Sequence, residues 1–369
     1  MIKLEYLISS CYNNLNISER GYFMNTKKRI DWVDVAKGIG IICVILVHVE
    51  EMFTSTPYTK LPLYTFHMPI FFFLSGYLFS AKSSFGEFLK NKCRRILLPY
   101  FCLGGILILF DIYWHGRNPF GDSWFNKDYA MYDLMQLLTQ KRFLTLWFIA
   151  CLFWLSILFY VLVRFIEKEV IRAIVVAALT IAGLCYFYFG GTAIYWNVDV
   201  CLTALPFFYV GYLCKKADFI NEKILGSNKK LLFFIGFAAI DVVCAAINYQ
   251  LTGQHLEMFF NQYAIAPLTY LGAFAGIFAV ILISNVANCL PLRYIGANSM
   301  LFYAWHQTMM MPIVKDLFDR MDWFEQPEFA FSFGIHFGAV FTATLIICVV
   351  LGIVNELLCR VKLGFIVGK

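Results

Sequence analysis

Two ionisable side chains, Lys37 and His48, lie eleven residues apart in a stretch of the chain that is otherwise largely apolar. At about 100° per residue, this spacing makes three helical turns plus roughly 20°, so both side chains share one helix face, about 16 Å apart along the axis. Asp34 lies three residues before Lys37, and Glu51 three after His48, so both carboxylates can join that face. Ionisable groups at membrane depth usually face a bundle interior or a cavity, so the pattern predicts a functional site. In the alternative interpretation, Lys37 and His48 only mark the two ends of a membrane span.

An imidazole placed at this depth can remove a proton from a weak nucleophile such as a hydroxyl group. A second histidine, His67, opens the apolar segment 66–79, in which Pro69 suits the first turn of a helix. Antiparallel pairing of this segment with the one that carries His48 brings the two imidazoles to similar depth. A single histidine at a helix start is more often structural, and that alternative stays open for His67.

A second candidate site is a group of basic residues directly before the apolar segment that starts at Ile96. We name Lys92, Arg94 and Arg95 the basic cluster. Arginine binds phosphate oxygens with a forked pair of donors, so the basic cluster can hold a polyphosphate. Basic residues beside a membrane span also commonly contact anionic lipids, and the residues alone favour that interpretation.

The elements that must position these residues are membrane-spanning helices. The chain is 60% hydrophobic and 18% aromatic, with only 15% charged residues and a mean hydropathy of +0.69. A soluble domain of this length has no need of so much apolar surface, so we predict an all-α, polytopic bundle of about ten transmembrane helices. The apolar segments are 38–53, 64–80, 96–114, 143–163, 171–189, 200–214, 231–249, 264–286, 298–314 and 333–358.

The basic residues predict the orientation of the bundle. With both termini in the cytoplasm, the inner segments hold 23 of the 30 Lys and Arg residues and the outer loops hold 7. This asymmetry is what the positive-inside rule describes, so we expect a multi-pass protein of the plasma or inner membrane. The net charge of +6 then reflects topology and does not indicate nucleic-acid binding.

Cysteine and histidine spacing predicts neither a disulfide framework nor a metal site, because the chain has no CxxC and its six histidines are dispersed. We expect a cytoplasmic segment at 1–28, a transmembrane domain at 29–360 and a cytoplasmic tail at 361–369. Because residues 1–23 are mixed and polar, and Met24 directly precedes the first span, we further expect translation to begin at Met24.

From residue 29 to the last apolar segment the chain resembles the membrane-bound acyltransferase 3 family, in particular its fucose O-acetylase-like branch. Each motif is weak by itself, but their order and spacing together are specific. The chain departs from the family pattern at Lys92, where an arginine is typical, and we expect no hydrolase-like domain after the last span. The matching motifs are Lys37-x10-His48 within the run from Arg29, the Phe66-to-Phe79 block, Lys92-x-x-Arg95 before Pro99, Leu146-Trp147-Phe148, and Ile295-Gly296-Ala297-Asn298-Ser299-Met300 leading to His306.

The resemblance implies transfer of an acetyl or similar acyl group from acyl-CoA to a hydroxyl of a surface or lipid-linked sugar, with no permanently bound cofactor. It implies catalytic roles for His48, Lys37 and Asp34, and CoA-phosphate binding by the basic cluster. We expect the substrate pocket to include His67, Glu51, Trp147, Asn298, Ser299 and His306. Direct transfer and an acyl-His48 intermediate both fit the residues. The main alternative is a transporter, for which no internal repeat is detectable. A non-enzymatic scaffold has no feature in its favour.

Overall fold

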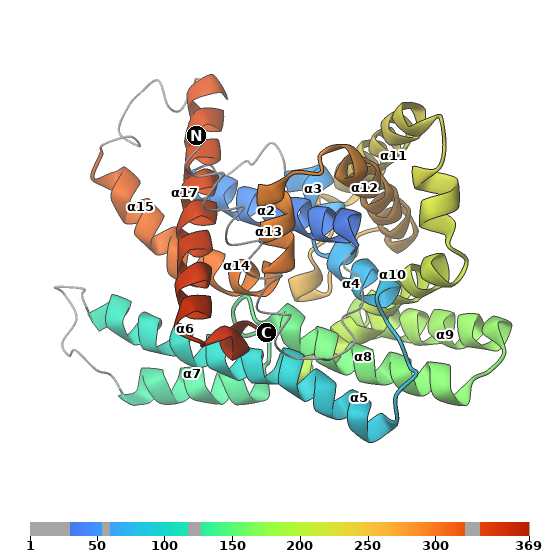
Figure 1. The fold of residues 1–369 in the computed structure, drawn as a ribbon, viewed down its shortest axis with the longest axis horizontal. Helices are drawn as coiled ribbons and strands as arrows, with labels where there is room; N and C mark the ends of the chain where they lie inside the picture. The colour runs from blue at the N-terminus through green and yellow to red at the C-terminus, as the bar shows by residue number, and fades with distance from the viewer. Residues whose placement is uncertain (1–29, 54–59, 117–126, 322–332, 369) are drawn as a thin grey trace.

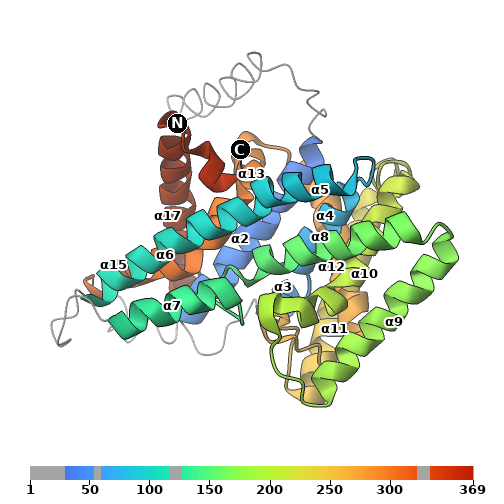
Figure 2. The same ribbon diagram turned by 90° about the horizontal axis from the view of Figure 1, so that it is seen from below.

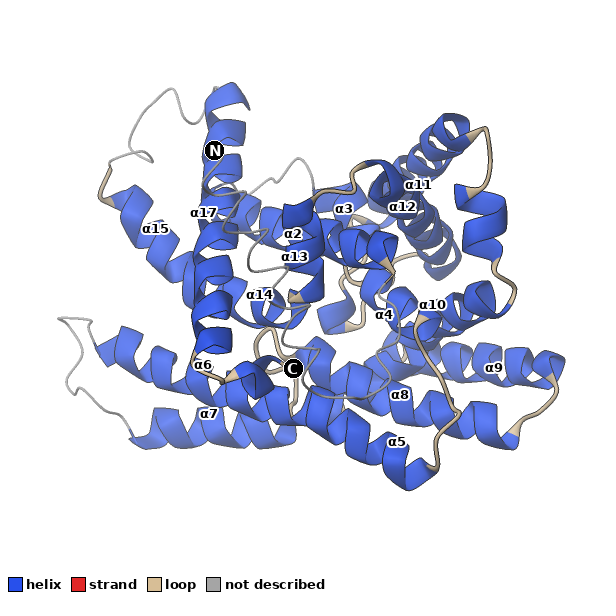
Figure 3. Ribbon diagram, viewed as in Figure 1, coloured by secondary structure: helices blue, strands red, loops and turns tan. Residues whose placement is uncertain are grey.

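The computed structural model describes residues 30–53, 60–116, 127–321 and 333–368 (Figure 1). The expected cytoplasmic segment at 1–28 and the expected start at Met24 fall outside these ranges. The described residues form helices and contain no β-strand, as Figure 3 shows. The predicted all-α fold is therefore confirmed.

The long helices of the described chain are numbered as in Figure 1. They are α2 (Asp31–Phe53), α6 (Leu98–Gly116), α7 (Lys127–Thr139), α8 (Trp147–Phe165), α9 (Glu169–Tyr188), α10 (Val198–Lys216), α11 (Lys230–Thr252), α12 (Ala266–Val286) and α17 (Phe333–Arg360). Shorter helices connect them: α3 (Lys60–Phe66), α4 (Pro69–Tyr77), α5 (Phe85–Lys92), α13 (Leu290–Ala297), α14 (Ser299–Trp305) and α15 (Met311–Asp319).

Eight helices of the described chain are long and apolar enough to cross a membrane. They lie at Asp31–Phe53, Phe85–Trp114, Trp147–Phe165, Glu169–Tyr188, Tyr195–Lys216, Lys230–Thr252, Ala266–Val286 and Gly334–Arg360. The other two predicted spans, 64–80 and 298–314, are helical but broken into short pieces. The first breaks between α3 and α4, and in the second a π-helical turn at His306–Met310 separates α14 from α15.

Helix α2 lies at the centre of the bundle and packs against α12, α13, α14 and α17 (Figures 1 and 2). Glycines allow the closest of these approaches. A Cβ at Gly38 would collide with the carbonyl oxygen of Leu292 in α13, and one at Gly296 would collide with that of Asp34. Small residues are the usual means by which helices approach in membranes, because packing must replace the hydrophobic driving force. This contact fixes the start of α14 beside the N-terminal half of α2.

Glycines also allow the close approach of helices α4 and α10. A Cβ at Gly76 would collide with the carbonyl oxygen of Phe208, and one at Gly211 would collide with that of Phe73. The α4 side chains from Pro69 to Leu74 are buried. The broken span therefore lies inside the bundle and away from lipid, where interrupted helices are tolerated.

Candidate active site

One face of α2 supplies side chains to two cavities in succession. Lys37 and Ile41 line a smaller cavity of about 150 Å³. Val44, His48 and Glu51 line a larger cavity of about 760 Å³. Steps of four, three, four and three residues keep all five side chains on one helix face. The predicted shared face of Lys37 and His48 is thus present, with each residue in a different cavity.

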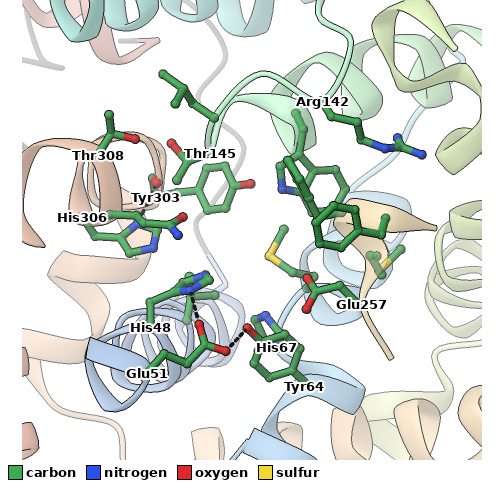
Figure 4. A pocket seen from close by; sticks show the side chains of 18 of the residues that line it. His48, Glu51, Tyr64, His67, Arg142, Thr145, Glu257, Tyr303, His306 and Thr308 are labelled. Carbon is green, nitrogen blue, oxygen red and sulfur yellow. Dashed lines mark hydrogen bonds and ion pairs between the residues drawn. The ribbon is translucent and has the colours of Figure 1, made fainter. Parts of the chain in front are cut away.

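Three histidines from separate segments line the larger cavity (Figure 4). The ring centroids of His48 and His306 lie 5.4 Å apart. His306 lies at the start of the π-helical turn, and its Nδ1 lies 2.8 Å from the carbonyl oxygen of Tyr303. His67 occupies the turn between α3 and α4, with Nδ1 2.9 Å from the carbonyl oxygen of Leu63.

These carbonyl contacts determine what the imidazoles can do. Because a carbonyl only accepts, Nδ1 of both His67 and His306 carries the proton, and each Nε2 is then an acceptor. Nε2 of His306 is buried and has no hydrogen-bond partner among the described residues. The larger cavity therefore presents buried imidazole acceptors beside His48, an arrangement suited to accepting or passing a proton.

Glu51 links His48 to the short helix α3. Nδ1 of His48 lies 3.4 Å from one Glu51 oxygen, while the other oxygen accepts from Lys60 Nζ at 2.6 Å and from Tyr64 Oη at 3.1 Å. The Glu51 carboxylate is thus oriented by α3 and in turn favours His48 with its proton on Nδ1 and Nε2 free.

The opposite wall of the larger cavity is the connection between α7 and α8. Arg142 donates to Asn197 Oδ1 at 3.0 Å and forms an ion pair with Asp199, which is 3% exposed. Arg142 and Leu144 have φ angles of 60° and 48°, which non-glycine residues rarely adopt. Such strained backbone persists only where its surroundings over-determine it, and it clusters at functional sites. Asn197 also donates to the carbonyl oxygen of Trp147 at 3.2 Å, which ties the start of α8 to the same wall.

Aromatic and carboxylate side chains complete the larger cavity. Trp147 and Phe259 both line it, with ring centroids 6.2 Å apart. Glu257 also lines it, and its Oε2 lies 3.5 Å from Nε2 of His255. Apolar rings beside a few polar groups characterise sites for small polar ligands. Figure 4 shows Glu257 across the cavity from His306, with Tyr64 and His67 on a neighbouring wall.

The smaller cavity collects Lys37 and Ser299, two of the residues that the sequence indicated. Asp34 and Asn298 are buried and lie close in sequence to Lys37 and Ser299, but they line neither cavity. Asn298 donates from Nδ2 to the carbonyl oxygen of Tyr294 at 2.7 Å, and so holds the junction of α13 and α14.

The basic cluster lies at the end of α5 and on a π-helical turn at Cys93–Leu97. Arg94 and Arg95 are exposed, and Lys92 Nζ lies 5.4 Å from the Phe88 ring centroid. None of the three lines either cavity. Single π-helical turns often occur at functional sites, but this one lies on the surface, apart from the histidines.

The structure thus gathers seven of the twelve indicated residues at the two cavities. His48, Glu51, His67, Trp147 and His306 line the larger one, and Lys37 and Ser299 the smaller. Residues that the sequence did not single out complete the larger cavity, among them Lys60, Tyr64, Arg142, Glu257 and Tyr303. Within the described ranges, no group of three or more His, Cys, Asp or Glu residues is arranged to hold a metal ion.

A family model described as an acyltransferase domain, that of acyltransferase 3, matches residues 30–353. No curated protein matches the chain. The matched range begins just before α2 and ends within α17, so it includes both cavities and the basic cluster.

Proposed function

The chain belongs to the acyltransferase 3 family, and from this premise we propose that it transfers an acetyl or similar acyl group from acyl-CoA to a sugar hydroxyl. The acceptor class is a cell-surface or lipid-linked saccharide. The observation that carries the proposal is the larger cavity, in which His48 and His306 face each other beside Trp147 and Glu257. Aromatic rings, carboxylates and imidazole groups form a surface suited to a hydroxyl-rich ring.

His48 is the proposed general base. Its Nε2 takes the proton of the acceptor hydroxyl as the hydroxyl oxygen attacks the thioester carbonyl carbon. The carbon–sulfur bond then breaks, and the proton passes to the departing CoA thiolate. Glu51 favours the imidazolium that forms in between, because it lies on the opposite ring nitrogen.

Attack by Nε2 of His48 itself is the alternative first step, with an acyl-imidazole as intermediate. The two routes differ in one observable. Labelled acetyl-CoA mixed with the protein in the absence of acceptor adds one acetyl mass to the chain only in the second route.

The donor is proposed to enter from the cytoplasm. The positive-inside distribution puts the N-terminal end of α2 on that side, so the smaller cavity with Lys37 faces the cytoplasm and the larger cavity faces outward. The basic cluster, on the same side by this count, is proposed to bind the CoA phosphates. Asp34 is proposed to support the Lys37 ammonium.

Purified protein in nanodiscs tests the proposal, with labelled acetyl-CoA and surface glycan as substrates. His48→Ala is expected to reduce transfer by a factor of about 10² to 10⁴, the usual contribution of a general base. His336→Ala is the matched control, because His336 is also buried but lies in α17 and lines neither cavity. Near-normal transfer by His48→Ala, or equal loss in both variants, contradicts the assignment.

A further inference from the structure

Four segments contribute residues to both cavities, and the larger cavity has further lining residues from other parts of the chain. In α2 the lining residues pass from Lys37 to His48, and in α14 and its π-helical turn from Ser299 to His306. The segment after α3 contributes Met68 to the larger cavity and Ser75 to the smaller. The start of α8 does likewise, with Trp147 in the larger cavity and Leu152 in the smaller. The cavities therefore lie one after the other along a common axis.

Tyr303 is the one described residue that lines both cavities. It lies midway between Ser299 and His306 in sequence, and the residue is 5% exposed. Figure 4 shows its ring on the wall of the larger cavity beside His306 and Thr145. The position of the ring makes it the wall that the two cavities share.

Other rings support Tyr303 from the side of the smaller cavity. Phe148 packs edge-on against Tyr303 with ring centroids 5.2 Å apart, and Phe71 packs edge-on against Phe148 at 5.8 Å. Phe71 and Phe148 both line the smaller cavity. Edge-to-face packing of this kind holds rings in defined positions. These contacts thus hold the Tyr303 ring at one end of a row of packed aromatic rings.

We propose that the Tyr303 ring narrows the aperture between a donor cavity, the smaller one, and an acceptor cavity, the larger one. The ring thereby limits the length of the acyl group transferred. This inference rests on the proposed function for its substrates. The thioester carbon must reach His48 from the Lys37 side, and the acyl group must pass Tyr303 to do so. A short acyl group passes the ring, whereas a longer one collides with it.

Until the acyl group passes it, the same ring separates the thioester from water in the larger cavity. Without an acceptor in place, a water molecule there is the competing nucleophile at the carbonyl carbon. Its oxygen bonds to that carbon, the carbon–sulfur bond breaks, and the products are the free acid and CoA. A closed aperture therefore restricts hydrolysis of the donor.

Two readouts of enzyme activity test the aperture. Tyr303→Ala is expected to raise the ratio of hydrolysis to transfer at least fivefold, and to raise the rate with hexanoyl-CoA relative to acetyl-CoA at least tenfold. Tyr303→Phe keeps the ring and is expected to keep both ratios within twofold of the parent protein. If Tyr303→Phe behaves like Tyr303→Ala, the hydroxyl rather than the ring matters, and the proposal is wrong.

Leu152→Ala is the matched control, because Leu152 lines only the smaller cavity. It enlarges that cavity without removing the shared wall, so the hydrolysis ratio is expected to stay unchanged. A rise equal to that of Tyr303→Ala would mean that cavity volume, and not the aperture, controls hydrolysis. Tyr303→Leu replaces Tyr303→Ala if the latter does not fold.

A labelling experiment tests the aperture without any enzyme activity. Ser75 is partly exposed and lines only the smaller cavity, so Ser75→Cys reports access to it. In oriented proteoliposomes of a variant lacking the twelve native cysteines, a charged methanethiosulfonate is added on the side of the larger cavity.

Labelling of Ser75→Cys is expected to be at least tenfold faster with Tyr303→Ala than with Tyr303 in place. If Ser75→Cys is labelled at the same rate with Tyr303→Ala and with Tyr303 in place, the proposal is wrong, whether that rate is fast or slow. If labelling behaves as expected while the parent protein consumes no acyl-CoA, the aperture stands as a barrier and the proposed function fails.

Discussion

The Glu51 carboxylate offers the sharpest test of how the site orients His48. Glu51→Gln keeps the shape of the side chain and removes its charge. The His48–Glu51 separation is 3.4 Å, and the two side chains are 20% and 30% exposed. A hydrogen bond to a charged group contributes about 1.5–3 kcal/mol, and this length and exposure place Glu51 at the lower end.

A loss of about 1.5 kcal/mol in stabilisation of the imidazolium corresponds to roughly a tenfold lower kcat. The KM for acyl-CoA is expected to remain unchanged, because Glu51 lines the larger cavity and not the smaller. Steady-state transfer of labelled acetyl by purified protein in nanodiscs measures both constants.

Glu257→Gln is the control for general electrostatics. It removes a negative charge from the same cavity, but the nearest imidazole to Glu257 in an ion-pair geometry is His255 rather than His48. A kcat that is unchanged in Glu51→Gln refutes the orienting role. An equal fall in kcat for both glutamine variants shows that the overall charge of the cavity matters instead.

Two further predictions concern the cytoplasmic side. Neutral substitution of all three residues of the basic cluster is expected to raise the KM for acyl-CoA at least tenfold and to leave the acceptor KM unchanged. The reason is that each lost phosphate contact costs about 1.5–3 kcal/mol. A change in the acceptor KM alone would show a lipid-binding role. For sidedness, single cysteines at Ser227 and Gln254, on either side of α11, are to be labelled in intact cells with an impermeant reagent. We expect labelling at 254 and not at 227, and the reverse pattern would invert the topology and exclude cytoplasmic entry of the donor.

The sequence predicted those parts of the structure that depend on local pattern. Apolar length alone identified the helical segments, and the spacing within α2 placed Lys37 and His48 on one face. Pro69 correctly indicated the helix start that follows the first break, at 67–68, but the short helix α3 before it was not expected. The break at 306–310 was missed, because hydropathy does not distinguish a continuous span from two short helices buried by neighbours.

The larger cavity includes residues that the sequence pattern could not identify. Arg142 and Glu257 come from connections between helices, and each is more than 90 residues from His48 in the chain. Which loop closes over which helix is decided by tertiary packing, and a single sequence carries no signal for it. The resemblance to the family supplied His306, whose place beside His48 spacing alone did not indicate. Asn298 has a different place from the one expected, since it lines neither cavity.

The glycine contacts between α4 and α10 bear on how the protein enters the membrane. Helix α4 has nine residues, so it is about 13 Å long, less than half of the 30 Å hydrocarbon core. In the folded protein it is therefore too short to cross the hydrocarbon core as an independent span. Its partner carbonyl at Phe208 is synthesised more than 130 residues later than Gly76. The segment that carries His67 thus reaches its final depth only after α10 has been made, and the site is completed late in biogenesis.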